Sequence, residues 1–136
     1  MKMGAVRVQV RLVNGIDEGL SRSGQLRPED VRSYEGEALV DTGAMDNVIP
    51  VSVMNRLGLQ AVDHIGVRYA DGRRETVDKV APITMYLLDR RATAEALVLG
   101  DEILIGQIAL ESLDLHVDCL NQRLIPNHPE GPVFRV

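Results

Sequence analysis

The chain has 136 residues, a formal net charge of −5 and a hydrophobic fraction of 45%, with only 3% aromatic residues. This length suits one domain, residues 1–136, with an aliphatic core, and an acidic chain without a Lys/Arg run argues against nucleic-acid binding. No stretch approaches the roughly 18 consecutive apolar residues of a membrane span. Polar residues interrupt the N-terminal valines, so no apolar signal core is expected, and a single Cys119 provides no disulfide framework. We therefore expect a cytoplasmic protein.

Alternation of apolar and polar residues predicts strands through most of the chain. The first strand covers residues 6–12, where apolar side chains alternate with polar ones. Periodicity is lost over residues 14–32, which predicts a long connecting loop that is either functional or partly structured. Strand character returns at residues 38–40 and leads directly into Asp41-Thr42-Gly43.

The middle of the chain predicts a short helix and a hairpin. The helix covers residues 50–57, with a proline at its start and a glycine after its end. Alternating segments at 65–70 and 74–78 flank Asp71-Gly72, which is the sequence form of a two-residue type I′ turn. Further strands are predicted at 83–88, 94–99, 103–105, 115–117 and 123–125, a second helix at 107–113, and a proline-rich tail at 127–136.

A faint internal repeat relates two parts of the chain. Residues 39–43 precede the first predicted helix and Leu57-Gly58-Leu59, and residues 104–106 precede the second predicted helix and Leu113-Asp114-Leu115. Two such units of strand, turn and helix predict an approximate internal twofold axis. The identity between the units is low enough that coincidence is the alternative.

One carboxylate has an unusual position. Asp41 follows an apolar run and is followed at once by Thr42 and Gly43. An acid at the end of a buried strand is costly to desolvate, so its position indicates a role beyond solubility. The tripeptide occurs once in the chain, so a second carboxylate that shares a proton with Asp41 is expected from a second copy of the protein. The alternative is an ordinary Asp/Gly turn in which the acid satisfies nearby amides.

The residues around Asp41 resemble the retropepsin-like aspartic proteases, the family of the retroviral proteases and their bacterial relatives. In that family a strand rich in Ala and Leu runs into Asp-Thr-Gly-Ala, and small polar residues and an aliphatic pair follow, here Asn47, Val48 and Ile49. The hairpin at Asp71-Gly72 and the segment 103–106 before a short helix come in the expected order. The resemblance spans roughly residues 36–125.

This resemblance implies an all-β fold: a closed or partly open β-barrel of the acid protease type with one or two short helices. It implies an aspartic endopeptidase that acts as a homodimer on peptides or unfolded proteins, without metal or cofactor. Asp41 of each protomer would form the catalytic dyad. Thr42 would fix the turn through hydrogen bonds to the partner chain, and Gly43 would let the backbone approach the carboxylate and the substrate.

The resemblance also implies a substrate groove. The hairpin at 69–76 would be a flap that covers the peptide, and a solvent-exposed hairpin without substrate contact is the alternative. Several aliphatic positions match the groove of retroviral relatives, and structural packing is the alternative for each of them. The implied substrate-binding residues are Leu39, Ala44, Val48, Tyr69, Ala70, Asp71, Gly72, Arg73 and Leu104.

Two features depart from the retroviral pattern. Where those enzymes carry an acid after Asp-Thr-Gly-Ala and an arginine after the late glycine, this chain has Met45 and Gln107, so that ion pair is absent. The tail at 127–136 is too proline-rich for a central strand in a sheet shared between protomers. Asp114 and Asp118 do not follow an apolar strand and a Thr-Gly turn, so neither is expected to act as a second catalytic acid.

Other chemistries find less support. His64, His116 and His128 are far apart in the sequence, and none has a second His or a Cys at metal-ligand spacing, so no zinc site is expected. No His/Cys order makes Cys119 a nucleophile. The runner-up function is a catalytically silent module of the same fold that binds peptides or dimerises without turnover. A third interpretation is a monomer that becomes active only inside a larger complex.

Overall fold

The computed structural model describes residues 5–136, and within this range the chain forms nine strands and three short helices. No helix in the described range is long and apolar enough to cross a membrane. In chain order the elements are β1 (Val6–Asn14), α1 (Gly15–Arg22), the 3₁₀ turn η1 (Pro28–Asp30), β2 (Ser33–Val40), β3 (Asn47–Ile49), α2 (Val51–Leu57), β4 (Ala61–Arg68), β5 (Arg74–Leu87), β6 (Arg90–Val98), β7 (Ile103–Ile105), α3 (Gln107–Leu113), β8 (Leu115–Asp118) and β9 (Arg123–Pro126).

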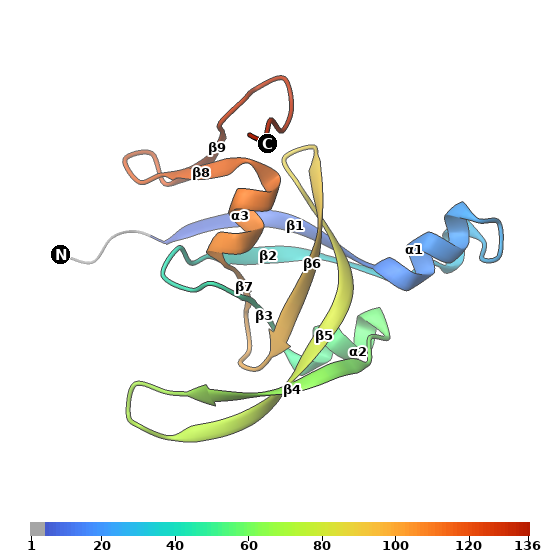
Figure 1. Cartoon of the computed structure of the whole chain (residues 1–136), viewed down its shortest axis with the longest axis horizontal. Coiled ribbons are helices and arrows are strands. Elements are labelled where there is room, and N and C mark those ends of the chain that lie inside the picture. The colour runs from blue at the N-terminus through green and yellow to red at the C-terminus, as the bar shows by residue number, and fades with distance from the viewer. Residues whose placement is uncertain (1–4) are drawn as a thin grey trace.

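Six strands close into a barrel (Figure 1). They are hydrogen-bonded in the order β1-β2-β7-β3-β6-β5, and a further pairing of β1 with β5 completes the ring. β4 pairs only with β5, so these two strands extend as a hairpin beyond the barrel. β8 and β9 form a separate two-stranded sheet at the opposite end of the molecule from this hairpin. The all-β barrel that the sequence predicts is therefore confirmed.

The barrel interior is aliphatic, as the composition predicts. The largest fully buried side chains of residues 5–136 are leucines, isoleucines and valines from strands of the ring and from α2 and α3, and all of them except Val13 belong to one hydrophobic core. β-branched and leucine side chains suit this interior because they pack closely on a pleated surface. The fully buried set is Leu12, Val13, Ile49, Leu57, Val80, Ile83, Ile105, Leu110 and Leu113.

The connection at residues 14–32 is partly structured, because it contains α1 and η1. The side chain of Asn14 caps α1 by accepting hydrogen bonds from the N–H groups of Ile16 and Asp17, at 2.9 and 3.0 Å. The buried Asp17 carboxylate accepts three hydrogen bonds from Arg32, two from the guanidinium and one from the backbone N–H. These bonds, chiefly those from the guanidinium, lower the pKa of Asp17. The sequence predicted one or two helices, and the structure has a third, α1.

Two strand predictions need correction. The segments predicted separately at 74–78 and 83–88 are one long strand, β5, whose pairing with β6 shifts register between Val80 and Ile83. Proline interrupts the strand pattern at this irregularity, so the sequence reads as two strands. The short strand β3 was not predicted, because three residues are too few to show a period.

The C-terminal segment is held by a buried polar cluster at the end of α3. Asp114 accepts hydrogen bonds from the side chains of His128 and Asn127 and from the backbone N–H of Val133, at 2.6, 2.9 and 3.0 Å. These three bonds, that from His128 first, lower the pKa of Asp114 to about 2. The buried guanidinium of Arg90 donates to the backbone carbonyls of residues 113, 114 and 128. Part of the proline-rich tail is thus attached to the barrel without adding a strand to it.

Candidate active site

Asp41 lies directly after β2, where this strand runs parallel to β7. The register pairs Leu39 with Leu104 and Val40 with Ile105, and the N–H of Asp41 donates to the carbonyl of Ile105 at 2.9 Å. Asp41 therefore stands at the point where two barrel strands end together. The loop that follows it returns to the barrel as β3, beside β7 (Figure 1).

The Asp-Thr-Gly turn holds its own carboxylate. The N–H of Gly43 donates to Oδ1 of Asp41 at 3.0 Å, and the N–H of Ala44 donates to the carbonyl of Asp41 at 3.2 Å. A Cβ at residue 43 would lie 3.3 Å from the same Oδ1, a tight contact that glycine avoids. Asp41 is half-buried, whereas Thr42 and Gly43 are exposed. One carboxylate oxygen is thus oriented by an amide while the group stays near the surface.

The start of α3 closes over this loop. The N–H of Gln107 donates to the carbonyl of Ala44 at 2.8 Å, and that of Ile108 donates to the carbonyl of Met45 at 3.3 Å. Gly106 makes this approach possible, because a Cβ there would lie 2.6 Å from two backbone carbonyl oxygens of the loop. The two units of the predicted repeat therefore meet backbone to backbone beside Asp41.

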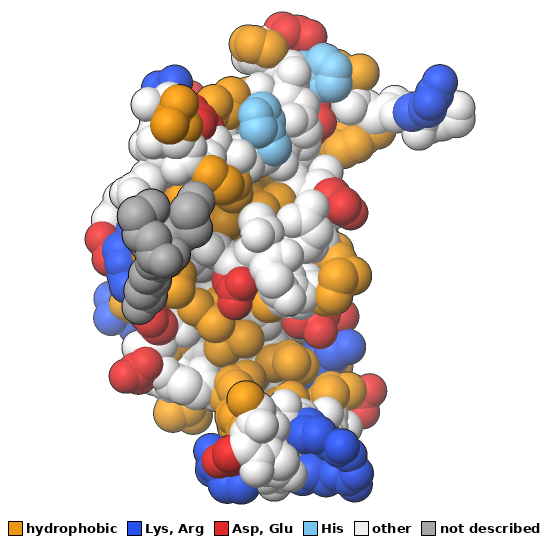
Figure 2. Space-filling view, turned by 90° about the vertical axis from the view of Figure 1, so that its left-hand side faces the viewer, with side chains coloured by type: hydrophobic (Ala, Val, Ile, Leu, Met, Phe, Trp, Pro, Cys, Tyr) orange, Lys and Arg blue, Asp and Glu red, His pale blue; other side chains and the backbone are white. Residues whose placement is uncertain are grey.

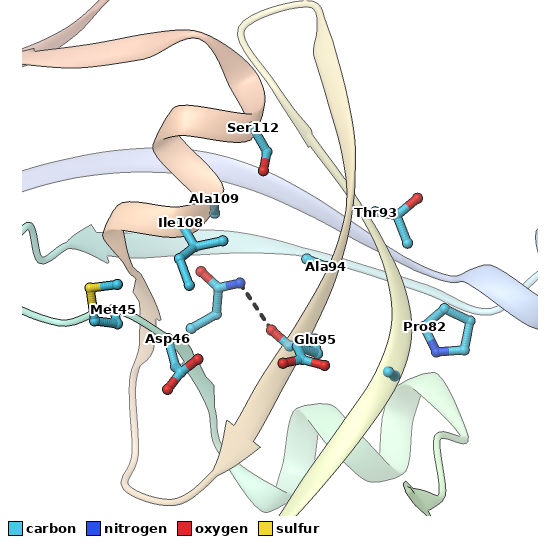
Figure 3. A pocket seen from close by; sticks show the side chains of 11 residues that line it. Met45, Asp46, Pro82, Thr93, Ala94, Glu95, Ile108, Ala109 and Ser112 are labelled. Atoms are coloured by element: carbon cyan, nitrogen blue, oxygen red, sulfur yellow. Dashed lines mark hydrogen bonds between the residues drawn. The ribbon is translucent and has the colours of Figure 1, made fainter. Parts of the chain in front are cut away.

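A buried amide joins the two units. The Oδ1 atom of Asn47 accepts the N–H of Gly106 at 3.0 Å, and its Nδ2 donates to the carbonyl of Glu95 at 3.0 Å, the bond dashed in Figure 3. Asn47 is 7% exposed, and its bond to Gly106 is buried, whereas its bond to Glu95 is partly buried. Sequence reasoning identified Asn47 only as a small polar residue of the motif. Its position at the start of an aliphatic pair was the available signal for this buried role.

The structure gives the internal repeat a geometric form. α2 and α3 each have seven residues, and each ends at a residue in the left-handed conformation, Gly58 with φ 64° and Asp114 with φ 57°. Leucines 57 and 113 before these caps are both fully buried. The two helices have equal lengths and equal caps, and β2 and β7, which begin the two units, pair in parallel. This geometry favours a true repeat over coincidence.

Three residues predicted to line a groove lie side by side. Leu104 is paired with Leu39 on one side and with Val48 on the other. All three are half-buried, whereas the neighbours of Leu104 in β7, Ile103 and Ile105, are buried in the core. Because side chains alternate along a strand, the three form a row on the outer face of the barrel. Ala44, also half-buried, lies in the loop after Asp41.

The predicted flap is a hairpin with a different turn from the one expected. The N–H of Gly72 donates to the carbonyl of Tyr69 at 2.9 Å, and the N–H of Tyr69 donates to the carbonyl of Arg73 at 2.8 Å. Only Gly72 has a positive φ, 89°, whereas a type I′ turn at Asp71-Gly72 requires two such residues. The loop is a three-residue turn, residues 70–72, closed by glycine. The type I′ assignment was therefore wrong, although the hairpin is present.

The surface between this hairpin and the barrel is apolar. Figure 2, which faces the left-hand side of Figure 1, shows hydrophobic side chains gathered above the hairpin at the bottom of the view. The tip of the hairpin carries Lys and Arg side chains in the same view. At the tip, the Arg73 guanidinium lies over the ring of Tyr69, 4.5 Å from its centroid, and binds Asp71 at 2.9 Å.

Residues 28–118 match the sequence model of a family described as aspartyl protease. The match covers the Asp-Thr-Gly turn, the hairpin and both units of the repeat. The chain belongs to the retropepsin-like aspartyl protease family. A search of curated proteins finds no match. Family membership supports a protease-type function on peptide substrates in general terms.

This chain carries an apolar surface where retroviral relatives carry the ion pair. Met45 is 63% exposed and Ile108 is 49% exposed, and their backbones are hydrogen-bonded to each other. The side chain of Gln107 donates to Glu111 on the same helix, at 3.3 Å. Two exposed apolar side chains therefore lie beside the Asp41 turn, and no ion pair joins the positions of Met45 and Gln107.

The same loop borders a cavity of about 320 Å³ between α3 and the β5–β6 hairpin (Figure 3). Met45, Asp46, Ile108 and Ser112 are among its lining residues, whereas Asp41 is not. Within residues 5–136, no three His, Cys, Asp or Glu side chains gather as a group that could hold a metal ion.

The other candidate acids are engaged elsewhere. Asp114 binds the C-terminal segment as described above. Asp118 accepts hydrogen bonds from the side chain and backbone of Asn121 within the β8–β9 turn, and these bonds lower its pKa. Both carboxylates therefore have structural partners at the end of the molecule opposite the flap.

Proposed function

We propose that this chain is an aspartic endopeptidase in which residues 1–136 act as one domain and two copies form a symmetric homodimer. The observation that carries the proposal is the Asp41 turn. Its carboxylate is oriented by the Gly43 amide at 3.0 Å, stays half-buried beside an exposed Thr42, and occurs in the only Asp-Thr-Gly of the chain. A dyad therefore requires Asp41 from each protomer.

The chemistry follows from two carboxyl groups that cannot both ionise. At a separation of about 3 Å they hold one proton between them. The ionised carboxylate takes a proton from a water molecule as this water attacks the peptide carbonyl, and the carboxylic acid protonates the carbonyl oxygen. No covalent enzyme intermediate is formed. The pair titrates as a unit, so neither pKa belongs to one protomer.

The substrate is an extended peptide or a segment of unfolded protein. We propose that it lies between the flap, residues 69–76, and the outer row of Leu39, Leu104 and Val48. Main-chain hydrogen bonds would add it as a strand, and the half-buried row would receive apolar side chains. Flap closure would then exclude water from the dyad, apart from the attacking molecule.

The dimer would form across the surface that carries the Asp41 turn. Thr42 is exposed in the single chain, so its hydroxyl is accessible to the partner's turn. Met45 and Ile108 lie beside it and are exposed apolar side chains. Apolar contact in place of an ion pair predicts a dimer whose stability depends little on salt, because screening acts on charges.

The experiment compares the digestion of an unfolded protein mixture between about pH 4 and 7 by wild type and Asp41→Asn. The substitution is isosteric, and we expect it to lower the rate by about 10²–10⁴-fold, the usual contribution of an acid–base group. Asp101→Asn, which alters an exposed carboxylate in the β6–β7 turn, is the matched control and should leave the rate unchanged.

Circular dichroism checks that each variant is folded, and sedimentation measures the oligomeric state. Identical digests from wild type and folded Asp41→Asn would refute the protease proposal and leave a silent module that binds peptides or dimerises. A wild type that sediments as a monomer while it cleaves would refute the dyad across two chains.

A further inference from the structure

Two arginines face each other near the tip of the flap. The register of the β4–β5 hairpin places Arg68 directly opposite Arg74, next to the turn. Both side chains are exposed. Like charges directly opposite each other in an antiparallel pair are destabilising. The pair therefore works against the stability of the hairpin that carries it.

The nearby carboxylates form no ion pair with these arginines. The carboxylate of Asp71 binds Arg73, and that of Glu75 accepts a hydrogen bond from the hydroxyl of Tyr69 at 3.2 Å. Of the ion pairs formed within residues 5–136, none includes Arg68 or Arg74. Two guanidinium groups thus remain available to an anion from outside the chain.

The arginines border an open hollow. In the register of the hairpin, Arg68 and Arg74 lie on the same face as Gly66 and Thr76. These four residues are among those that line a hollow of about 390 Å³, and no atom lies within 4 Å of the Cβ position at Gly66. The hollow is large enough for a carboxylate side chain, which either guanidinium can bind through two N–H groups.

Positive side chains gather at this end of a protein whose net charge is negative. The net charge of the chain is −5, so an acidic polypeptide is not attracted to the molecule as a whole. Figure 2 shows the Lys and Arg side chains gathered at the end of the hairpin. In a peptide held under the flap, the residues that flank the scissile bond would lie next to this tip. Long arginine side chains can reach such residues around the edge of the hairpin.

We propose that the flap selects peptide substrates that carry Asp or Glu close to the scissile bond, and that Arg68 and Arg74 bind those carboxylates. This inference rests on the proposed protease function. It adds a specificity-determining pair to the flap, and it names acidic peptides as the preferred substrate class. Arg73 is not part of the pair, because Asp71 and Tyr69 already occupy its guanidinium.

The test uses two synthetic peptide libraries with the same randomised apolar centre, one with Glu and one with Gln at the flanking positions. We expect wild type to cleave the Glu library about fivefold faster, the effect of an exposed ion pair worth about 1 kcal/mol. Arg68→Gln/Arg74→Gln should remove the preference, so that this variant cleaves the Glu and Gln libraries at equal rates. Raising the ionic strength should also reduce the preference.

The matched control is Arg135→Gln. Arg135 is exposed and lies at the C-terminal end, which is opposite the flap in Figure 1, so the variant loses the same charge at a remote place and should keep the preference. Thermal unfolding of Arg68→Gln/Arg74→Gln should occur at the wild-type temperature or above it, because a like-charge pair is removed. Equal cleavage of both libraries by wild type would overturn the inference and leave the protease proposal intact.

Fluorescence anisotropy of labelled Glu and Gln peptides separates the remaining outcomes. If wild type cleaves neither library but binds the Glu peptide more tightly, and the double arginine variant loses this difference, the protease proposal fails while the binding of acidic peptides by Arg68 and Arg74 is supported. If neither library is cleaved and both peptides bind equally, both are overturned. A preference that survives in the double variant also overturns the inference.

Discussion

Gly106→Ala tests the close approach that builds the site. The glycine has φ −90° and ψ 177°, a conformation open to any residue, so its substitution carries no backbone strain. The added Cβ would lie 2.6 Å from the carbonyl oxygens of Met45 and Asp46, whereas ordinary contact begins at 3.4 Å, so the loop has to move by about 0.8 Å. Both obstructing atoms belong to the backbone and cannot turn aside as a side chain can.

The expected cost combines overpacking and lost hydrogen bonds. Overpacking of a well-packed region costs about 1–3 kcal/mol. The displaced loop also weakens the bonds from the N–H groups of Gln107 and Ile108, each worth about 0.5–1.5 kcal/mol. A total near 3 kcal/mol lowers Tm by roughly 10 °C for a protein of this size. Proteolysis should fall as well, because the displaced loop carries the Asp41 turn.

Gly19→Ala is the matched control. Gly19 lies in α1, no atom lies within 4 Å of its Cβ position, and alanine in a helix is favoured over glycine by about 1 kcal/mol. Thermal unfolding followed by circular dichroism should therefore show a lower Tm for Gly106→Ala and an unchanged or higher Tm for Gly19→Ala. Equal Tm values for the two variants would refute the reasoning that the loop leaves no space for a side chain.

Three further predictions concern stability. Asn47→Ala leaves the buried N–H of Gly106 and the partly buried carbonyl of Glu95 without partners and should cost about 2–4 kcal/mol in urea unfolding. A loss below about 1 kcal/mol would contradict the proposed role of the amide. Leu88 and Asp89 both have positive φ in the two-residue β5–β6 turn, a conformation that asparagine and glycine adopt more readily. Leu88→Asn/Asp89→Gly should therefore raise the free energy of unfolding by about 1–2 kcal/mol. An unchanged Tm would contradict this argument. The pKa of Asp114 is lowered from 3.8 to about 2. The ionised carboxylate therefore stabilises the folded state fully above about pH 4, and this stabilisation is lost as the pH falls through about 2. Asp114→Asn should flatten this part of the stability profile, and an equally steep acid loss in the variant would contradict the assignment.

The site motif was predictable because it depends on local chemistry. Asp41-Thr42-Gly43 follows an apolar strand, and the late glycine at residue 106 precedes a short helix, so residue type and order were sufficient to indicate the two units. Leu39, Val48 and Leu104, which the resemblance named as groove candidates, lie side by side on β2, β3 and β7. The sequence could not decide between core and groove, because an aliphatic residue suits both.

Other features depend on long-range contacts that no local pattern records. α1 was missed because the bonds that hold it involve Asn14 and Arg32 at the two ends of the connection. The turn at Leu88-Asp89 carries no glycine or asparagine, so it gives no turn signal although both residues are left-handed. The role of Asn47 appears only when Gly106 and Glu95 lie beside it, 59 and 48 residues away in sequence.

The separation of the two Asp41 carboxylates in a crystal of the assembled protein tests the central claim most directly. We expect a twofold axis between protomers and carboxyl oxygens about 3 Å apart, close enough to hold one shared proton. Protomers that associate through another surface, with the two Asp41 side chains far apart and in contact with bulk solvent, would contradict the proposed dyad.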